Sequence, residues 1–276
     1  MPRADLRRLG IVVLVLVIGA AIVAPWIVPV GPDVQGDVVH TRFLPPATVD
    51  ATGLIHPLGT DRLGRDVWSR LVHGARVSLA VGALAMGISL LLGVTVGALA
   101  AGARKSVEAV LLGLTDFALG LPRVVLLLLL ASFWEPSATL VVLVLGFTGW
   151  MPIARLVHAE MKSQLARPYV LSALALGAGK FRVLIRHALP HTISPVLAAA
   201  TLGVGYAITL EAGLSFLGLG VQPPTASWGT MIASGRETVV NAPWVGLAPG
   251  IALVIVVVAC TLIADSVRRR TYDVKT

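Results

Sequence analysis

Charged side chains gather in one short stretch, 56–70, which reads HPLGTDRLGRDVWSR. Asp61, Arg65, Asp66 and Arg70 could form ion pairs at helical spacing, with the glycines of the stretch setting turns. General acid–base catalysis by these acids is the alternative, but no nucleophile–base set accompanies them. We therefore interpret the stretch as local structure. Its candidate residues are Gly59, Thr60, Asp61, Gly64, Arg65 and Asp66.

Three further charges stand alone in apolar sequence: Asp116, Arg123 and Glu211. A charge inside a membrane is costly, so each calls for a functional hypothesis. Asp116 and Arg123 are seven residues apart, near one face of a helix, and we expect them to pair with each other or with another subunit; substrate contact is the alternative. Glu211 could close a gate near the outer face or bind backbone amides of the loop that follows it. We favour a structural role for Glu211.

Sequence signatures of metal and nucleotide sites are missing. The one cysteine, Cys260, lies in an apolar run, and the six histidines are scattered, so we expect no metal site and no bound cofactor. No phosphate-binding GxxxxGK[ST] loop occurs, and neither do HExxH or GxSxG. The chain by itself is therefore not expected to hydrolyse ATP. If transport is ATP-driven, ATP and Mg²⁺ belong to partner subunits.

The composition indicates a protein surrounded by lipid. Of the 276 residues, 56% are hydrophobic and 13% are charged, and the mean hydropathy is +0.87. Soluble domains carry about 25% charged residues. The net charge of +8 would also suit nucleic acid, but nothing resembles a nucleic-acid module.

Six apolar runs predict an all-α bundle of about six transmembrane helices. Each has about 20 residues or more, enough to cross roughly 30 Å of hydrocarbon, where a helix satisfies its own backbone. Because the first run is too long for a usual signal peptide, we interpret it as a retained span. The predicted spans are 11–30, 77–101, 109–133, 138–157, 192–218 and 244–265.

The distribution of basic residues predicts the orientation. With both termini in the cytoplasm, inside segments hold fifteen Lys and Arg residues and outside segments hold six. The positive-inside rule therefore favours N-in and C-in.

A basic segment, 167–196, interrupts the apolar runs. We predict a short helix over 169–176, ended by Gly177 and Gly179 through positive φ, and a second helix over 181–189 that stops at Pro190. A helix–glycine–helix between two spans is typical of a docking element for a soluble partner, and an ordinary cytoplasmic loop is the alternative.

This segment resembles the coupling loop of ABC importer permeases, roughly EAAxxxG, nine residues, then IxLP. Ala173, Gly177, Leu189 and Pro190 match, and Ile185 lies close by, but the acidic position of the pattern falls at Leu171 and its first alanine at Ser172. The resemblance implies that these residues contact an ATPase. The coupling-loop candidates are Leu171, Ser172, Ala173, Leu176, Gly177, Gly179, Ile185, Leu189 and Pro190.

Two other stretches resemble the dipeptide, oligopeptide and nickel permease subfamily of these importers. One is 56–79, which continues into GARVSL, and the other is 211–229, EAGLSFLGLGVQPPTASWG. The resemblance implies a type I-like permease bundle in the bacterial inner membrane, working with a second homologous permease subunit, cytoplasmic ABC ATPase subunits and an extracytoplasmic substrate-binding protein. Di- or oligopeptides are the expected substrate and nickel is the alternative. An ion-gradient-driven transporter and a membrane scaffold are the readings from other classes.

The predicted organisation has four parts. Residues 1–30 form the first span, 31–75 an extracytoplasmic loop with the GTDRLGRD motif, and 76–265 the permease core with the coupling loop at 158–190. Residues 266–276 form a cytoplasmic tail.

Overall fold

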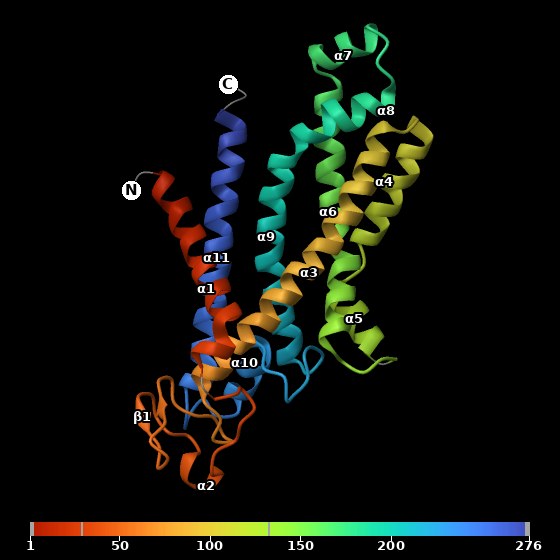
Figure 1. Cartoon of the computed structure of the whole chain (residues 1–276). Coiled ribbons are helices and arrows are strands. Elements are labelled where there is room, and N and C mark those ends of the chain that lie inside the picture. The colour runs from red at the N-terminus through yellow and green to blue at the C-terminus, as the bar shows by residue number, and fades with distance from the viewer. Residues whose placement is uncertain (1–2, 29, 132, 274–276) are drawn as a thin grey trace.

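The computed structural model describes residues 3–28, 30–131 and 133–273, which form a helical bundle with one small hairpin (Figure 1). The long helices are α1 (Arg3–Ile27), α3 (Val67–Gly102), α6 (Ala138–Leu165), α9 (Leu189–Phe216) and α11 (Trp244–Asp273). The shorter helices are α2 (Val38–Thr41), α4 (Lys105–Leu119), α5 (Arg123–Ala131), α7 (Pro168–Ala175), α8 (Lys180–Val183) and α10 (Trp228–Arg236), with a π-helical turn, η1, at Leu184–Ala188. The strands β1 (Thr48–Val49) and β2 (Ile55–His56) pair antiparallel.

Five helical segments among the described residues are long and apolar enough to cross a membrane. They are Asp5–Trp26, Val67–Gly102, Ala138–Leu165, Lys180–Phe216 and Trp244–Arg268. Large apolar side chains such as Leu16 and Leu91 stand exposed on them, as expected for helices that face lipid or another subunit. The prediction of a helical membrane protein is confirmed.

The predicted third span, 109–133, is not one helix. α4 has 15 residues and α5 has 9, each shorter than the roughly 20 needed to span a bilayer alone. The break falls at residues 120–122 because Pro122 disfavours a helical conformation for Leu121, the residue before it. α5 then begins, with the N–H of Leu126 donating to the carbonyl of Pro122.

The second span begins ten residues before the predicted start at 77. Asp66 caps it, accepting a 2.6 Å hydrogen bond from the N–H of Ser69. Hydropathy missed these first turns because they are polar, yet Ser69 and Arg70 are buried in protein.

Glycines allow α3 and α6 to pack closely. A Cβ on Gly93 would lie 2.6 Å from the Cβ of Ile153, and one on Gly97 would lie 2.5 Å from the carbonyl oxygen of Ala154. Small residues of this kind permit close helix contact within membranes. α3 thereby becomes the central helix, contacting α6, α9 and α1.

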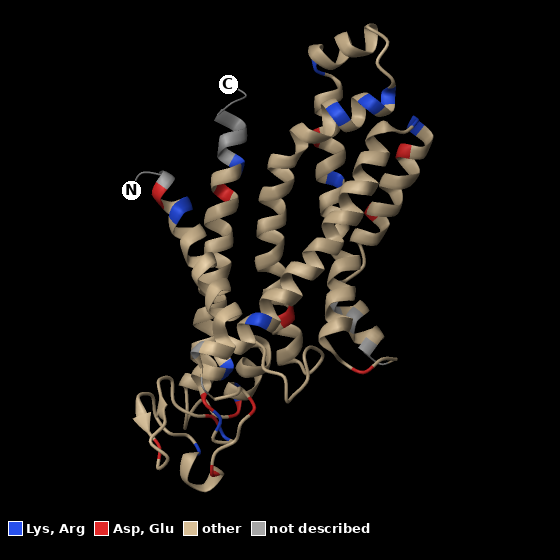
Figure 2. Ribbon diagram, in the orientation of Figure 1, with Lys and Arg blue, Asp and Glu red and all other residues tan. Residues whose placement is uncertain are grey.

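The two ends of the bundle differ. Both termini lie toward the end that carries α7 and α8, whereas the β1–β2 hairpin and α2 lie at the other (Figure 1). Figure 2 shows basic residues on the α7–α8 segment and on α6, and residues of both charges in the loops around the hairpin.

Candidate functional site

The 56–70 motif builds a compact cap over the start of α3. The ring of His56 lies between two carboxylates, with Nδ1 2.9 Å from Asp66 Oδ1 and Nε2 3.4 Å from Asp50 Oδ2. Asp66 therefore orients His56 with one oxygen and caps α3 with the other. These contacts link the hairpin to the helix.

Asp61 is the second centre of the motif. Its carboxylate accepts from the Nε of Arg65 at 2.7 Å and from the backbone N–H groups of Leu63 and Arg65, and the Nε of Arg70 lies 3.9 Å away. Asp61, Arg65 and Arg70 are all buried. The predicted pairing of Asp61 with Arg65 is present, but in a turn rather than on a helix.

Gly59, Thr60 and Gly64 shape that turn. Gly59 has φ +73° and Gly64 has φ +69°, a region that favours glycine. A Cβ on Gly64 would also meet the hydroxyl of Thr41. The hydroxyl of Thr60 accepts from the N–H of Leu44 at 2.8 Å. The backbone carbonyl of Thr60 accepts from the indole N–H of Trp244 at 3.2 Å.

Glu211 is the hub of a buried hydrogen-bond network. Its Oε1 accepts from the hydroxyl of Ser215 at 2.7 Å and of Ser227 at 2.9 Å, and its Oε2 accepts from the hydroxyl of Ser78 at 3.0 Å. The Glu211 side chain is fully buried. Three donors therefore compensate a carboxylate that burial would otherwise penalise strongly.

Each of the three serines also accepts a backbone N–H. Ser78 accepts from Trp228 at 3.1 Å, Ser215 accepts from Val221 at 3.1 Å, and Ser227 caps α10 by accepting from Thr230 at 3.1 Å. The network therefore ties α3, α9 and the start of α10 together. The sequence left two roles open for Glu211, closing a gate or binding backbone amides of the following loop; in the structure it is Ser215 that accepts the N–H of Val221 in that loop.

Sequence reasoning did not single out these serines as site residues. Two signals could have pointed to them: Ser215 lies four residues after Glu211, on the same helix face, and Ser78 and Ser227 fall inside the quoted motifs. The pairing of Ser78 with Glu211 and Trp228, 133 and 150 positions away, has no local signal.

Asp116 pairs with Arg155 of α6, at 3.4 Å, and both side chains are more than half exposed. The side chain of Arg123 lies outside the described residues, so its predicted pairing with Asp116 stays a prediction. About two turns nearer the start of α4, Glu108 contacts His158 at 2.7 Å and Lys162 at 2.8 Å. Sequence reasoning missed these links between α4 and α6.

The predicted docking helix is present as α7, projecting from one end of the bundle (Figure 1). Pro168 occupies its first turn, and Gly177 follows it at φ +86°, as predicted. Gly179, in contrast, has φ −64° and precedes α8. The expectation of positive φ at Gly179 is wrong, because Gly177 alone reverses the chain.

The predicted helix stop at Pro190 is also wrong. Helix continues from Lys180 to Phe216, through α8, η1 and α9. Proline lacks an N–H and crowds the carbonyl four residues earlier, which normally breaks a helix. Here η1 widens the preceding turn, with the N–H of Leu189 donating to the carbonyl of Leu184, so Pro190 fits at the start of α9.

The outer face of this segment is apolar and basic. Leu171 is 54% exposed, Leu176 90% and Phe181 74%. Ile185 is also exposed, whereas Ser172 is tied to the carbonyl of Pro168 at 3.0 Å. No Asp or Glu occurs from 161 to 210 in the sequence.

No group of three or more His, Cys, Asp or Glu side chains that could hold a metal ion occurs among the residues that the structure describes.

Residues 93–271 match the family described as the inner membrane component of binding-protein-dependent transport systems. The match covers more than half of the chain. The chain belongs to this family.

Similar proteins agree with this assignment. The permease is 38% identical to a peptide transport system permease protein of Brucella suis, over 95% of this chain and 85% of the relative. It is 36% identical to the di/tripeptide transport system permease protein DppC of Pseudomonas aeruginosa, over 94% and 85% of the two chains.

A solved structure is similar in fold. A chain of the MetNI methionine ABC transporter in an inward-facing conformation has a TM-score of 0.62, covering 73% of the permease and 96% of that chain. At 19% identity, this likeness shows the fold alone.

Family membership fixes several properties. The permease is an inner membrane component, and its transport system includes a binding protein and ATPase subunits. ATP is hydrolysed by those separate subunits, and the family carries no bound cofactor of its own.

Proposed function

We propose that the chain is a permease subunit of an ATP-driven ABC importer of di- or oligopeptides. The observation that carries the proposal is the family match over 93–271, together with relatives whose names specify peptide or di/tripeptide transport. A second, homologous permease subunit completes the translocation pathway in this proposal, and a binding protein delivers the substrate from outside.

The proposed topology has six crossings, with both termini in the cytoplasm. The excess of basic residues in the inside segments supports this orientation. The termini also lie toward the same end as α7 and α8. α4 and α5 together provide the remaining crossing, because each is too short to provide it alone.

α7 is the proposed contact to an ATPase subunit. It projects from the bundle, presents Leu171 and Leu176, and is joined to α6 on one side and, through α8 and η1, to α9 on the other. Residues 171–177 dock, while Leu189 and Pro190 lie where the segment re-enters the bundle. Because helix is unbroken from α8 to α9, a displacement of the docked segment shifts α9 as a rigid element.

The network of Glu211 and the 56–70 motif are the proposed structural supports of the opposite end. Glu211 accepts hydrogen bonds from three serine hydroxyls of the protein itself, which supports a role in holding α10 against α3 and α9 rather than in binding substrate. Asp61 and Asp66 likewise bind side chains and amides of their own loop.

Other readings have less support. Nickel transport has no specific observation in its favour, and no metal-binding group occurs among the described residues. Family membership also disfavours a gradient-driven transporter or a scaffold, which need no ATPase or binding protein.

A mild-detergent purification from the native membrane tests the proposal. An ATPase and a second permease at comparable amounts, with ATPase activity and uptake of labelled dipeptides in proteoliposomes, are the expected results. Purification of the chain alone would reject the complex. A complete complex whose binding protein takes Ni²⁺ but not peptides would reject the substrate.

A further inference from the structure

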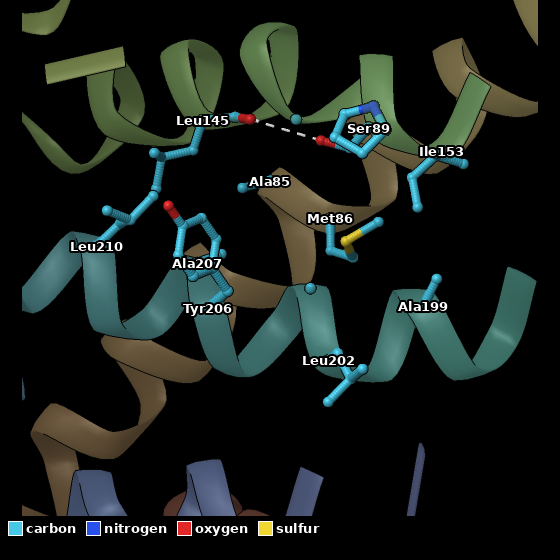
Figure 3. Close-up of a pocket in the computed structure, with 13 residues that line it drawn as sticks. Ala85, Met86, Ser89, Leu145, Ile153, Ala199, Leu202, Tyr206, Ala207 and Leu210 are labelled. Carbon is cyan, nitrogen blue, oxygen red and sulfur yellow. Dashed lines mark hydrogen bonds between the residues drawn. The ribbon is translucent and has the colours of Figure 1, made fainter. Parts of the chain in front are cut away.

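An apolar cavity of about 320 Å³ lies among α3, α6 and α9 (Figure 3). Its lining residues fall near the middle of these three helices. The space exists because several of its lining residues are Gly or Ala, and larger side chains form the rest of its walls. It is lined by Ala85, Met86, Ser89, Leu145, Gly149, Pro152, Ile153, Ala199, Leu202, Gly203, Tyr206, Ala207 and Leu210.

The lining carries no charged side chain. The hydroxyl of Ser89 is engaged, since it donates to the carbonyl of Gly146 at 2.9 Å. Tyr206 and Leu202 are 55% and 43% exposed, whereas Ala85, Met86 and Ala207 are buried. The cavity therefore has a closed floor and a mouth on the α9 side. An uncharged, apolar group fits it, and a peptide terminus does not, because no charged side chain in the lining would compensate its charge.

The cavity also lies between helices that the α7–α8 segment connects. Its walls α6 and α9 are the two long helices that the α7–α8 segment joins. Any displacement of α6 relative to α9, driven from that segment, changes the width of the cavity. Met86, a flexible and polarizable side chain, can adapt one wall to groups of different shape.

The size sets the class of group. A dry cavity of about 150 Å³ lined by aliphatic side chains binds benzene. A volume of about 320 Å³ therefore accepts one Phe or Leu side chain with room for the adjoining backbone. Sites of this kind lie between the helices of bundles and hold ligands mainly through apolar contact.

We propose that this cavity receives an apolar side chain of the transported peptide, while the charged termini of the peptide stay outside it. The inference rests on the proposed peptide transport and adds a specificity-determining site within the membrane. It makes the permease, and not the binding protein alone, selective for apolar side chains.

Uptake of two dipeptides by the reconstituted complex tests the proposal. Ala199→Leu narrows the cavity, and we expect the ratio of Gly-Phe uptake to Gly-Gly uptake to fall about 10-fold, the size expected for excluding one buried aromatic side chain. The binding protein is the same in every sample, so a changed ratio reports on the permease. A control is needed for a second variant, Leu202→Ala, which is described below. Leu197→Ala serves, because Leu197 is 53% exposed on the same helix but does not line the cavity. The uptake ratios of Leu197→Ala should stay at their wild-type values.

Leu202→Ala widens the cavity instead of narrowing it, and it provides the test if the Ala199→Leu complex does not assemble. Widening the mouth should raise uptake of Gly-Trp relative to Gly-Phe. The inference is overturned if the uptake ratios are unchanged in Leu202→Ala and in any Ala199→Leu complex that assembles. It is also overturned if uptake of all peptides falls equally, since that result indicates that a lipid chain or the second permease fills the cavity. Peptide uptake by the wild-type complex is still intact in those cases. If the wild-type complex takes up no peptide, the proposed function fails as well.

Discussion

Ser78 of α3 donates a 3.0 Å hydrogen bond to Glu211 of α9, across 133 positions of sequence. This bond joins the end of the first motif to the start of the last one. Because Ser78 also accepts from the N–H of Trp228, one serine connects two long helices and α10.

Glu211→Gln should destabilise the protein, because a neutral amide replaces a carboxylate that accepts three hydroxyls. We expect the free energy of unfolding to fall by about 2–3 kcal/mol, within the range for hydrogen bonds to charged groups. Thermal unfolding in detergent measures it. Glu237→Gln is the control, since Glu237 forms an exposed pair with Arg62 and should lose less than about 1 kcal/mol. Lost uptake with normal stability and assembly would contradict the structural role.

Gly177→Val should uncouple ATP hydrolysis from uptake. The residue has φ +86° and open space around its Cβ position, so the penalty is conformational, about 1–3 kcal/mol for a side chain in this region. Uptake per ATP hydrolysed in proteoliposomes is the measurement. Gly179→Ala, at φ −64° with equal space, should behave as wild type. Normal coupling in Gly177→Val would rule out the proposed role of this turn.

Leu171→Glu should weaken attachment of the ATPase. Leu171 lies on an exposed apolar face in a segment without acidic residues, so an added carboxylate must lose its hydration on docking. We expect roughly 10-fold lower affinity, about 1.4 kcal/mol, by titration of ATPase subunits onto the purified permeases. Leu171→Met keeps the apolar contact and should bind normally. Stronger binding of the Glu variant would show that the partner retains a basic site for an acid.

Gly64→Ala should destabilise the loop more than Gly53→Ala. Both positions have positive φ, but a Cβ on Gly64 meets the hydroxyl of Thr41, while one on Gly53 meets nothing within 4 Å. We expect about 1 kcal/mol for Gly53→Ala and a larger loss for Gly64→Ala. Limited proteolysis of the 31–66 loop compares the two; equal cleavage would contradict the predicted clash.

Acid should release the turn at Asp50. The hydroxyl of Thr52, the N–H groups of Leu54 and Thr52 and the ring of His56 hold the pKa of Asp50 at about 2, below its usual 3.8. A lowered folded-state pKa contributes stability that is complete above about pH 4 and is lost as pH falls toward 2. Hydrogen exchange of residues 48–58, corrected for the intrinsic rate, should accelerate across that window. Asp50→Asn should remove the pH dependence, and an identical profile in that variant would assign it to another group.

Local sequence patterns were enough to predict the class of the protein. Apolar runs of bilayer length predicted five of the long helices, because hydropathy and backbone satisfaction act within each segment. Pro168 and Gly177 likewise predicted the start and end of α7, since caps and turns are local. The same local rules wrongly predicted a helix end at Pro190. The π-helical turn η1, just before the proline, widens the helix there, so the helix continues although Pro190 has no N–H to donate.

Contacts between distant segments could not be predicted in this way, because they depend on how the helices pack in three dimensions. The tertiary structure brought Ser78 and Ser227 to Glu211, paired Asp116 with Arg155, and placed the start of α3 inside the protein rather than in the loop. These partners lie far apart in the sequence, so no local rule pairs them, and helix packing decides which donors reach each carboxylate. Helix packing also set the cavity among α3, α6 and α9, whose volume depends on how closely three backbones approach.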